Sequence, residues 1–131
     1  MPVPVGEGFS VTQRQDIDRA VKDAERASGR HFSVHVGRCD GPSRAYAEQL
    51  HAQLPHPDDS ILVQVDPEGR TLEIVTGPEV TRTLSNRTVA VAAVTMQSAF
   101  ETGDIARGLV NGVQQLGELA RVPKSLHTDT P

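Results

Sequence analysis

Three aspartates are the residues whose type and spacing could most readily do chemistry. Asp58 and Asp59 follow His56 in a short polar segment, and Asp104 stands much later in the chain. Carboxylate oxygens are hard ligands that suit Ca²⁺, Mg²⁺ or Mn²⁺. One interpretation is therefore a divalent-ion site formed by Asp58, Asp59 and Asp104. The alternative is that the first two solvate a turn and that Asp104 caps a helix.

A cysteine and two histidines are weaker candidates. The single cysteine, Cys39, lies beside Arg38 in the segment 37–42, but the multi-residue loop ending in a spaced arginine that cysteine phosphatases use is missing. We expect an unactivated thiol there. His31 and His35 are four residues apart on a predicted strand and share one of its faces. They could form a zinc pair, or they could face a covering helix or solvent.

The composition narrows the class of partner. The formal net charge is −4, which argues against nucleic acid because phosphate-backbone binders normally have a basic surface. Aromatic residues make up 3% of the chain, so stacking platforms for single-stranded nucleic acid are not expected. No stretch approaches the roughly 18 apolar residues that span a bilayer, and no secretory signal is recognisable. We therefore expect a cytoplasmic protein without an integral membrane segment.

Helical and strand periodicities alternate along the chain and predict one domain over residues 12–121. An irregular leader (1–11) precedes it and a mobile tail (122–131) follows. Capping-box patterns start a first helix near Ser10 or Thr12, and Asp104 is placed to cap the last one. The predicted helices are 12–28, 42–54, 88–100 and 105–120, and the predicted strands are 31–36, 61–65 and 72–75.

These elements predict a mixed sheet. The helix between the first two strands makes a crossover, which places them parallel, and the turn 66–69 makes the third strand antiparallel. We expect a small three-layer α/β/α domain with three or four strands. The segment 88–100 is predicted as a helix, but its β-branched residues would also suit a strand. Gly108, Gly112 and Gly117 weaken the last helix by roughly 1 kcal/mol each relative to alanine. Close packing against another backbone would offset that cost.

Four short motifs and the order of elements resemble the TPM-domain family of thylakoid-lumen photosystem-repair proteins and many bacterial proteins. The branch most similar to this chain is short, stand-alone, actinobacterial and of unknown function. The resemblance implies that Asp59 and Asp104 lie near one end of the sheet, where divalent ions have been placed. A phosphatase activity has been attributed to some members of that family. The motifs are Ala45-Tyr46-Ala47, Asp59 before Ile61-Leu62-Val63, Gly77 after Val75-Thr76, and Phe100-Glu101-Thr102-Gly103-Asp104.

The functional prediction is a non-catalytic interaction or scaffold module. It would use a sheet edge or the apolar helix within 89–100 to bind a protein partner or a second copy of the chain. Two alternatives use Asp58, Asp59 and Asp104. One is a divalent-metal-dependent phosphate-ester hydrolase, and the other is a divalent-ion-binding module without catalysis. No other cofactor is expected.

Overall fold

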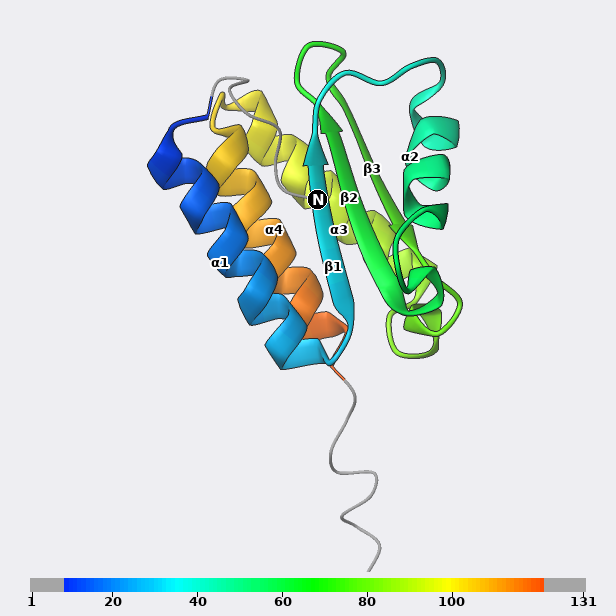
Figure 1. Ribbon diagram of the computed structural model, residues 1–131. Helices are drawn as coiled ribbons and strands as arrows, with labels where there is room; N and C mark the ends of the chain where they lie inside the picture. The colour runs from blue at the N-terminus through cyan, green and yellow to red at the C-terminus, as the bar shows by residue number, and fades with distance from the viewer. Residues whose placement is uncertain (1–8, 122–131) are drawn as a thin grey trace, which may run out of the picture.

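The computed structural model describes residues 9–121, which form four helices and three strands (Figure 1). The predicted tail 122–131 and residues 1–8 of the predicted leader lie outside the described residues. Two 3₁₀ turns, η1 (Pro57–Asp59) and η2 (Val80–Arg82), flank the hairpin. The other elements are α1 (Val11–Ser28), β1 (His31–Val36), α2 (Ser43–Ala52), β2 (Ser60–Asp66), β3 (Thr71–Thr76), α3 (Asn86–Glu101) and α4 (Ile105–Leu119).

The sheet has the strand order β1-β2-β3, with β2 in the centre. β1 runs parallel to β2, with His31 opposite Ser60, and β3 runs antiparallel to β2, with Ile61 opposite Thr76. The predicted mixed sheet is confirmed with three strands. The segment considered for a fourth strand is helix α3, whose buried residues Val89, Ala92 and Met96 recur every three or four positions and not every two.

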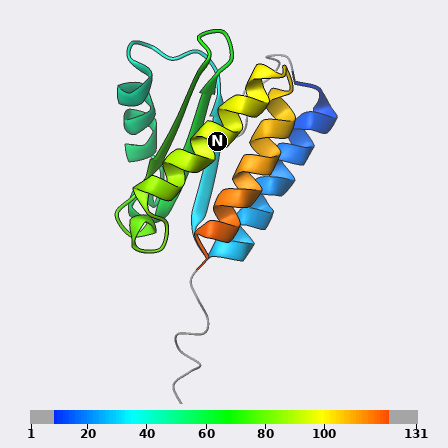
Figure 2. The same cartoon turned by 180° about the vertical axis from the view of Figure 1, so that it is seen from behind.

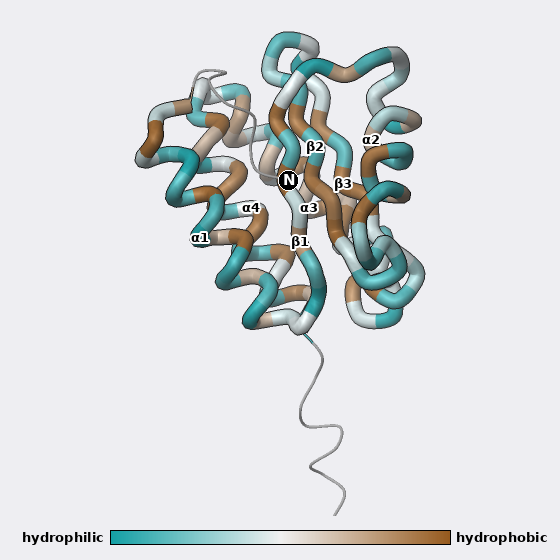
Figure 3. The backbone as a smooth tube through the Cα atoms, in the orientation of Figure 1, coloured by the Kyte–Doolittle hydropathy of each residue, from teal (hydrophilic) through white to brown (hydrophobic). Residues whose placement is uncertain are grey.

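Helices cover both faces of the sheet, which gives the predicted three layers. α2 lies alone on one face, and α1, α3 and α4 lie on the other (Figures 1 and 2). Strand alternation divides the apolar side chains: Val34 and Val63 enter the larger core under the three helices, whereas Leu62 and Val75 enter a smaller core under α2. The apolar bands along the strands are visible in Figure 3.

The helix ends follow the predicted caps. Ser10 accepts a hydrogen bond from the Gln13 N–H at 3.0 Å, and the Gln13 side chain accepts one from the Ser10 N–H at 2.9 Å, which completes the capping box of α1. Asp104 caps α4. Within residues 9–121, none of the helices combines the length and the apolarity that crossing a bilayer requires.

α4 packs between α1 and α3, and its glycines explain how closely it does so. A Cβ on Gly117 would lie 2.7 Å from the Cα of Ala24 in α1, so the predicted backbone-to-backbone packing is confirmed there. Gly108 and Gly112 instead make room for side chains of α3: a Cβ would lie 2.8 Å from the ring of Phe100 and 2.1 Å from the Met96 methyl, respectively. The packing of α4 against both neighbours therefore depends on small residues.

Candidate functional site

Asp58 and Asp59 lie in η1, immediately before β2. Asp59 Oδ1 is 2.5 Å from Arg30 Nη1, and the Arg30 side chain is only 13% exposed. The other guanidinium nitrogen of Arg30 donates to Thr83 Oγ1 at 3.2 Å. The carboxylate of Asp59 therefore neutralises a mostly buried guanidinium that joins the start of β1 to η1 and to the segment after η2.

Asp104 lies at the opposite end of the domain. Its side chain accepts a hydrogen bond from the Arg107 N–H at 3.0 Å and forms an ion pair with the Arg107 guanidinium at 3.4 Å. Thr83, the neighbour of Arg30, donates to the Ala120 carbonyl at 3.1 Å, which places the Asp59 cluster beside the C-terminal end of α4. α4 has 15 residues and is therefore about 22 Å long.

The three predicted metal ligands consequently do not converge on one point. Among residues 9–121, no group of three or more His, Cys, Asp or Glu side chains is arranged to hold a metal ion. Asp104 caps a helix, as its alternative interpretation requires. Ion binding by the adjacent pair Asp58 and Asp59 stays a prediction.

The two histidines of β1 contact different partners on the α2 face. The ring of His31 stacks on that of His56, with centroids 4.7 Å apart. His35 Nδ1 is 2.5 Å from the side-chain oxygen of Gln64 and its ring lies edge-on to Tyr46. Each imidazole thus has its own neighbour, which accords with a packing role on this face.

A polar cluster at the carboxyl ends of β1 and β2 was not predicted from the sequence. Gln64 is buried near the carboxyl end of β2 and donates to the Gly37 carbonyl at 3.1 Å, and its side-chain nitrogen is 3.5 Å from Cys39 Sγ. A cysteine nucleophile is hydrogen-bonded to its base. Here the His35 imidazole is bonded to the amide of Gln64 and not to the Cys39 thiol. A glutamine inside the apolar run 61–65 was the signal that could have revealed this cluster.

Asp66 completes the same end of the sheet. Its carboxylate accepts hydrogen bonds from the Gly69 N–H at 3.0 Å and from the Cys39 N–H at 3.2 Å. The bond from Gly69 is the main cause that lowers the pKa of Asp66, with smaller contributions from the N–H groups of Cys39 and Glu68 and from the charge of Arg38, while burial opposes them. Asp66 thus fixes both the hairpin turn and the loop after β1.

Asp66→Asn is expected to destabilise the domain in a pH-dependent way. The pKa of Asp66 is lower in the folded chain than its ordinary value of 3.8. The ionised carboxylate therefore stabilises the fold above pH 3.8, and this stabilisation is lost as the pH falls through the folded pKa. We expect a loss of about 1–2 kcal/mol at pH 7 that shrinks below pH ~3.8. Urea unfolding at pH 7 and pH 3 measures it, with Glu68→Gln, whose side chain is 80% exposed, as the control. An equal loss at both pH values would contradict this role.

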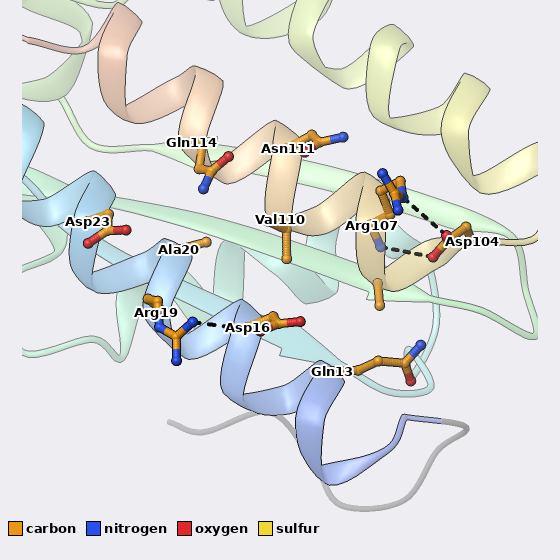
Figure 4. A pocket seen from close by; sticks show the side chains of 11 residues that line it. Gln13, Asp16, Arg19, Ala20, Asp23, Asp104, Arg107, Val110, Asn111 and Gln114 are labelled. Carbon is orange, nitrogen blue, oxygen red and sulfur yellow. Dashed lines mark hydrogen bonds and ion pairs between the residues drawn. The ribbon is translucent and has the colours of Figure 1, made fainter.

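A groove of about 390 Å³ lies on the surface between the N-terminal parts of α1 and α4 (Figure 4). Ala20 and Val110 lie between the helices, and charged side chains line the rim. Arg19 pairs with Asp16 at 4.0 Å, and its side chain is 72% exposed; the pair of Arg107 with Asp104 is similarly exposed. Exposed ion pairs of this kind hold their geometry weakly, so the groove offers a ligand no fixed charge.

Both edges of the sheet carry a charged side chain bonded to the backbone. At β1, the Glu25 carboxylate accepts a hydrogen bond from the Phe32 N–H at 3.0 Å. At β3, Arg44 donates to the Ile74 carbonyl at 2.9 Å. Adding a strand would require these backbone groups, and charged side chains at edge strands oppose such pairing. Of the two surfaces considered from the sequence, the sheet edge is therefore the less suited to an interface.

The outward face of α3 is the clearest unpartnered apolar surface of the described chain. Val91 and Val94 are 58% and 62% exposed, and they are two of only four exposed large hydrophobic residues in the range 9–121. The inward residues Val89, Ala92 and Met96 fill the core. In Figure 2, α3 crosses the molecule with no other described element in front of it. The outer face of α3 is defined here as Arg87, Ala90, Val91, Val94, Ser98 and Glu101, all exposed.

Solved structures of other bacterial proteins are similar to this fold. The solution structure of the BA42 protein from Bizionia argentinensis has a TM-score of 0.78 at 20% identity, covering 89% of this chain and 84% of that one. The N-terminal domain of a Porphyromonas gingivalis protein has a TM-score of 0.76 at 18% identity, covering 89% and 79%. The N-terminal domain of the cg2496 protein from Corynebacterium glutamicum has a TM-score of 0.74 at 16% identity, covering 94% and 82%. At these identities the similarity shows the fold alone.

The chain belongs to the DUF5130 family, a domain of unknown function whose model matches residues 3–117. Curated relatives are uncharacterized proteins from two strains of Mycobacterium tuberculosis, each 25% identical over 108 residues, or 82% of this chain. The matched region spans 65% of the length of those relatives. Family membership thus identifies the domain without assigning it an activity.

Proposed function

We propose that this domain is a non-catalytic protein-interaction module and that the outer face of α3 is its contact surface. The observation that carries the proposal is the pair Val91 and Val94, exposed side by side on a helix with no charged residue between Arg87 and Glu101. Burying apolar surface is the main favourable contribution to association, and exposed apolar patches commonly mark interfaces. The helix is otherwise firmly held, because its inner side fills the main core.

The blocked sheet edges and the divided carboxylates support this choice. An interaction through strand addition would have to displace Glu25 or Arg44 from the backbone groups that they bond. A metal-dependent hydrolase needs ligands and a nucleophile held together, whereas Asp59 and Asp104 lie at opposite ends of α4. We also propose that this domain shares its ancestry with TPM domains. The proposal does not extend to a shared chemistry.

Val94→Lys is expected to abolish a complex that the native chain forms in cells. A lysine on an exposed helix face changes stability by less than about 0.5 kcal/mol, but its ammonium group must be desolvated in an apolar interface. When the cells are crosslinked with formaldehyde before lysis, the native chain should elute by size exclusion well above its monomer mass of 14.1 kDa, and the variant should elute as a monomer.

Val11→Lys is the matched control. Val11 has nearly the same exposure, 59%, but lies on α1 away from the outer face of α3. Its substitution should leave the elution volume of the complex unchanged. Two results would overturn the proposal: monomeric elution of the native chain, or equal loss of the complex in the two lysine variants.

A further inference from the structure

We infer that the partner of the outer face of α3 is a second copy of this chain, bound so that the two α3 helices run antiparallel about a twofold axis at Val94. This inference rests on the proposed function and specifies its partner. Homodimers with twofold symmetry are the commonest oligomers of soluble proteins, and they require a surface that is complementary to itself. The outer face of α3 meets that requirement in its charges, its shape and its apolar centre.

The charges are self-complementary about Val94. Arg87 precedes Val94 by seven residues and Glu101 follows it by seven (94 − 87 = 7; 101 − 94 = 7). Seven residues are close to two helical turns, so all three lie on one side of the helix. When two such helices pack antiparallel with Val94 at the centre, Arg87 of each copy lies opposite Glu101 of the other. Neither residue has an ion-pair partner within residues 9–121.

Within one copy, Arg87 and Glu101 each lie at the end of α3 whose partial charge has the same sign as their own. The N-terminus of a helix carries partial positive charge and the C-terminus partial negative charge. Arg87 occupies the first turn of α3 and Glu101 its last position, so each is repelled by the helix dipole. Intramolecular electrostatics therefore do not account for this placement. In the antiparallel dimer, Arg87 lies beside Glu101 and the partially negative C-terminus of the neighbouring α3. Glu101 lies beside Arg87 and the partially positive N-terminus of that helix.

The centre of the same face suits close packing of two helices. The antiparallel arrangement brings Val94 against Val94 of the second copy and places Ala90 opposite Ser98 (90 + 98 = 2 × 94). Small residues at these positions let the backbones approach, and the valines supply the apolar contact. Arg87, Val94 and Glu101 repeat every seven residues, the spacing that keeps two helices in contact along their length at a crossing angle of about 20°.

The expected affinity is modest. α3 has 16 residues and is about 24 Å long, so one helix pair buries an area at the low end of known interfaces. We expect a dimer that dissociates at micromolar concentrations and exchanges rapidly. Sedimentation equilibrium of the whole chain from about 5 to 500 μM covers the corresponding range.

A charge-reversal series tests the pairing. In the dimer, Arg87→Glu and Glu101→Arg each convert two attractive contacts into two repulsive ones, and each should weaken association about tenfold. The double variant restores opposite charges and should associate within about threefold of the native chain. The single variants should nevertheless raise the melting temperature of the dilute monomer slightly, because each improves the match with the helix dipole. If Arg87 and Glu101 only stabilised the fold, each single variant would change the strength of association and the melting temperature in the same direction.

The outcomes separate this inference from the proposed function. A native chain that remains monomeric at 500 μM would overturn self-association. If Val94→Lys still removed a larger complex in extracts, the interaction module would stand with a different protein as its partner. Association that both single variants leave unchanged would overturn the antiparallel arrangement. Dissociation by each single variant with recovery in the double variant is the result that the inference predicts.

Discussion

Gly77→Ala is expected to lower the free energy of unfolding by about 3 kcal/mol or more. A Cβ at this position would lie 2.1 Å from the Pro57 carbonyl oxygen and 2.3 Å from that of Asp58. Both are backbone atoms of η1, so no side-chain rotation relieves the overlap. Two hydrogen bonds hold η1 and the end of β3 together. The Gly77 N–H donates to the Ser60 carbonyl at 3.1 Å, and the Glu79 N–H donates to the Asp58 carbonyl at 2.9 Å.

Gly41→Ala provides the comparison for this change. Gly41 has φ +82° and nothing within 4 Å of an added Cβ, so only left-handed backbone strain, about 1–2 kcal/mol, should appear. Chemical unfolding of both variants at pH 7 gives the two free energies on one scale. If Gly77→Ala cost no more than Gly41→Ala, the contact between η1 and the end of β3 would not be as tight as described.

Asp59→Ala is expected to cost about 2 kcal/mol, because it leaves a mostly buried guanidinium without its counter-charge. Arg30 is 13% exposed and Asp59 is 32% exposed, which places the pair between a surface contact and a fully buried one. Arg30→Met should cost less, since methionine fills much of the same volume without a charge. In the double variant the losses should be smaller than their sum, because neither partner then remains unpaired.

The same variant separates the ion-pair role of Asp59 from the metal role suggested by the sequence. We expect the cost of Asp59→Ala to be the same with chelator and with millimolar Ca²⁺, Mg²⁺ or Mn²⁺. Ligand at 100 times its dissociation constant would stabilise the native chain by about 2.7 kcal/mol, which a thermal melt detects readily. A stabilisation by one of these ions that Asp59→Ala removes would contradict the ion-pair interpretation and support ion binding at η1.

Much of the fold was predictable because local signals and long-range packing agree. The capping box at Ser10, the cap at Asp104 and the apolar run in 61–65 each specify an element without reference to the rest of the chain. The parallel pairing of β1 with β2 follows from the helix between them. The segment of α3 could not be assigned securely from the sequence, because its valines and alanines are compatible with a strand as well as a helix. In the fold it is a helix, and one side of it fills the core.

The candidate sites were less predictable because they depend on which ends of the elements meet. Sequence spacing could not show that Asp59 lies beside the end of α4 while Asp104 lies at its start. It also could not show that Glu25 and Arg44 reach backbone groups of the two edge strands. Exposure of Val91 and Val94 likewise became visible only when their helix had a defined inner side.

Site-specific photo-crosslinking tests the central claim most directly. A photoreactive amino acid placed at position 94 of the whole chain, and at position 11 as the control, reports which surface contacts a protein in the cell. We predict a discrete crosslinked adduct from position 94 and none from position 11, with an adduct of twice the chain mass if the partner is a second copy. Absence of any adduct from position 94, or the same adducts from both positions, would contradict an interaction through the outer face of α3.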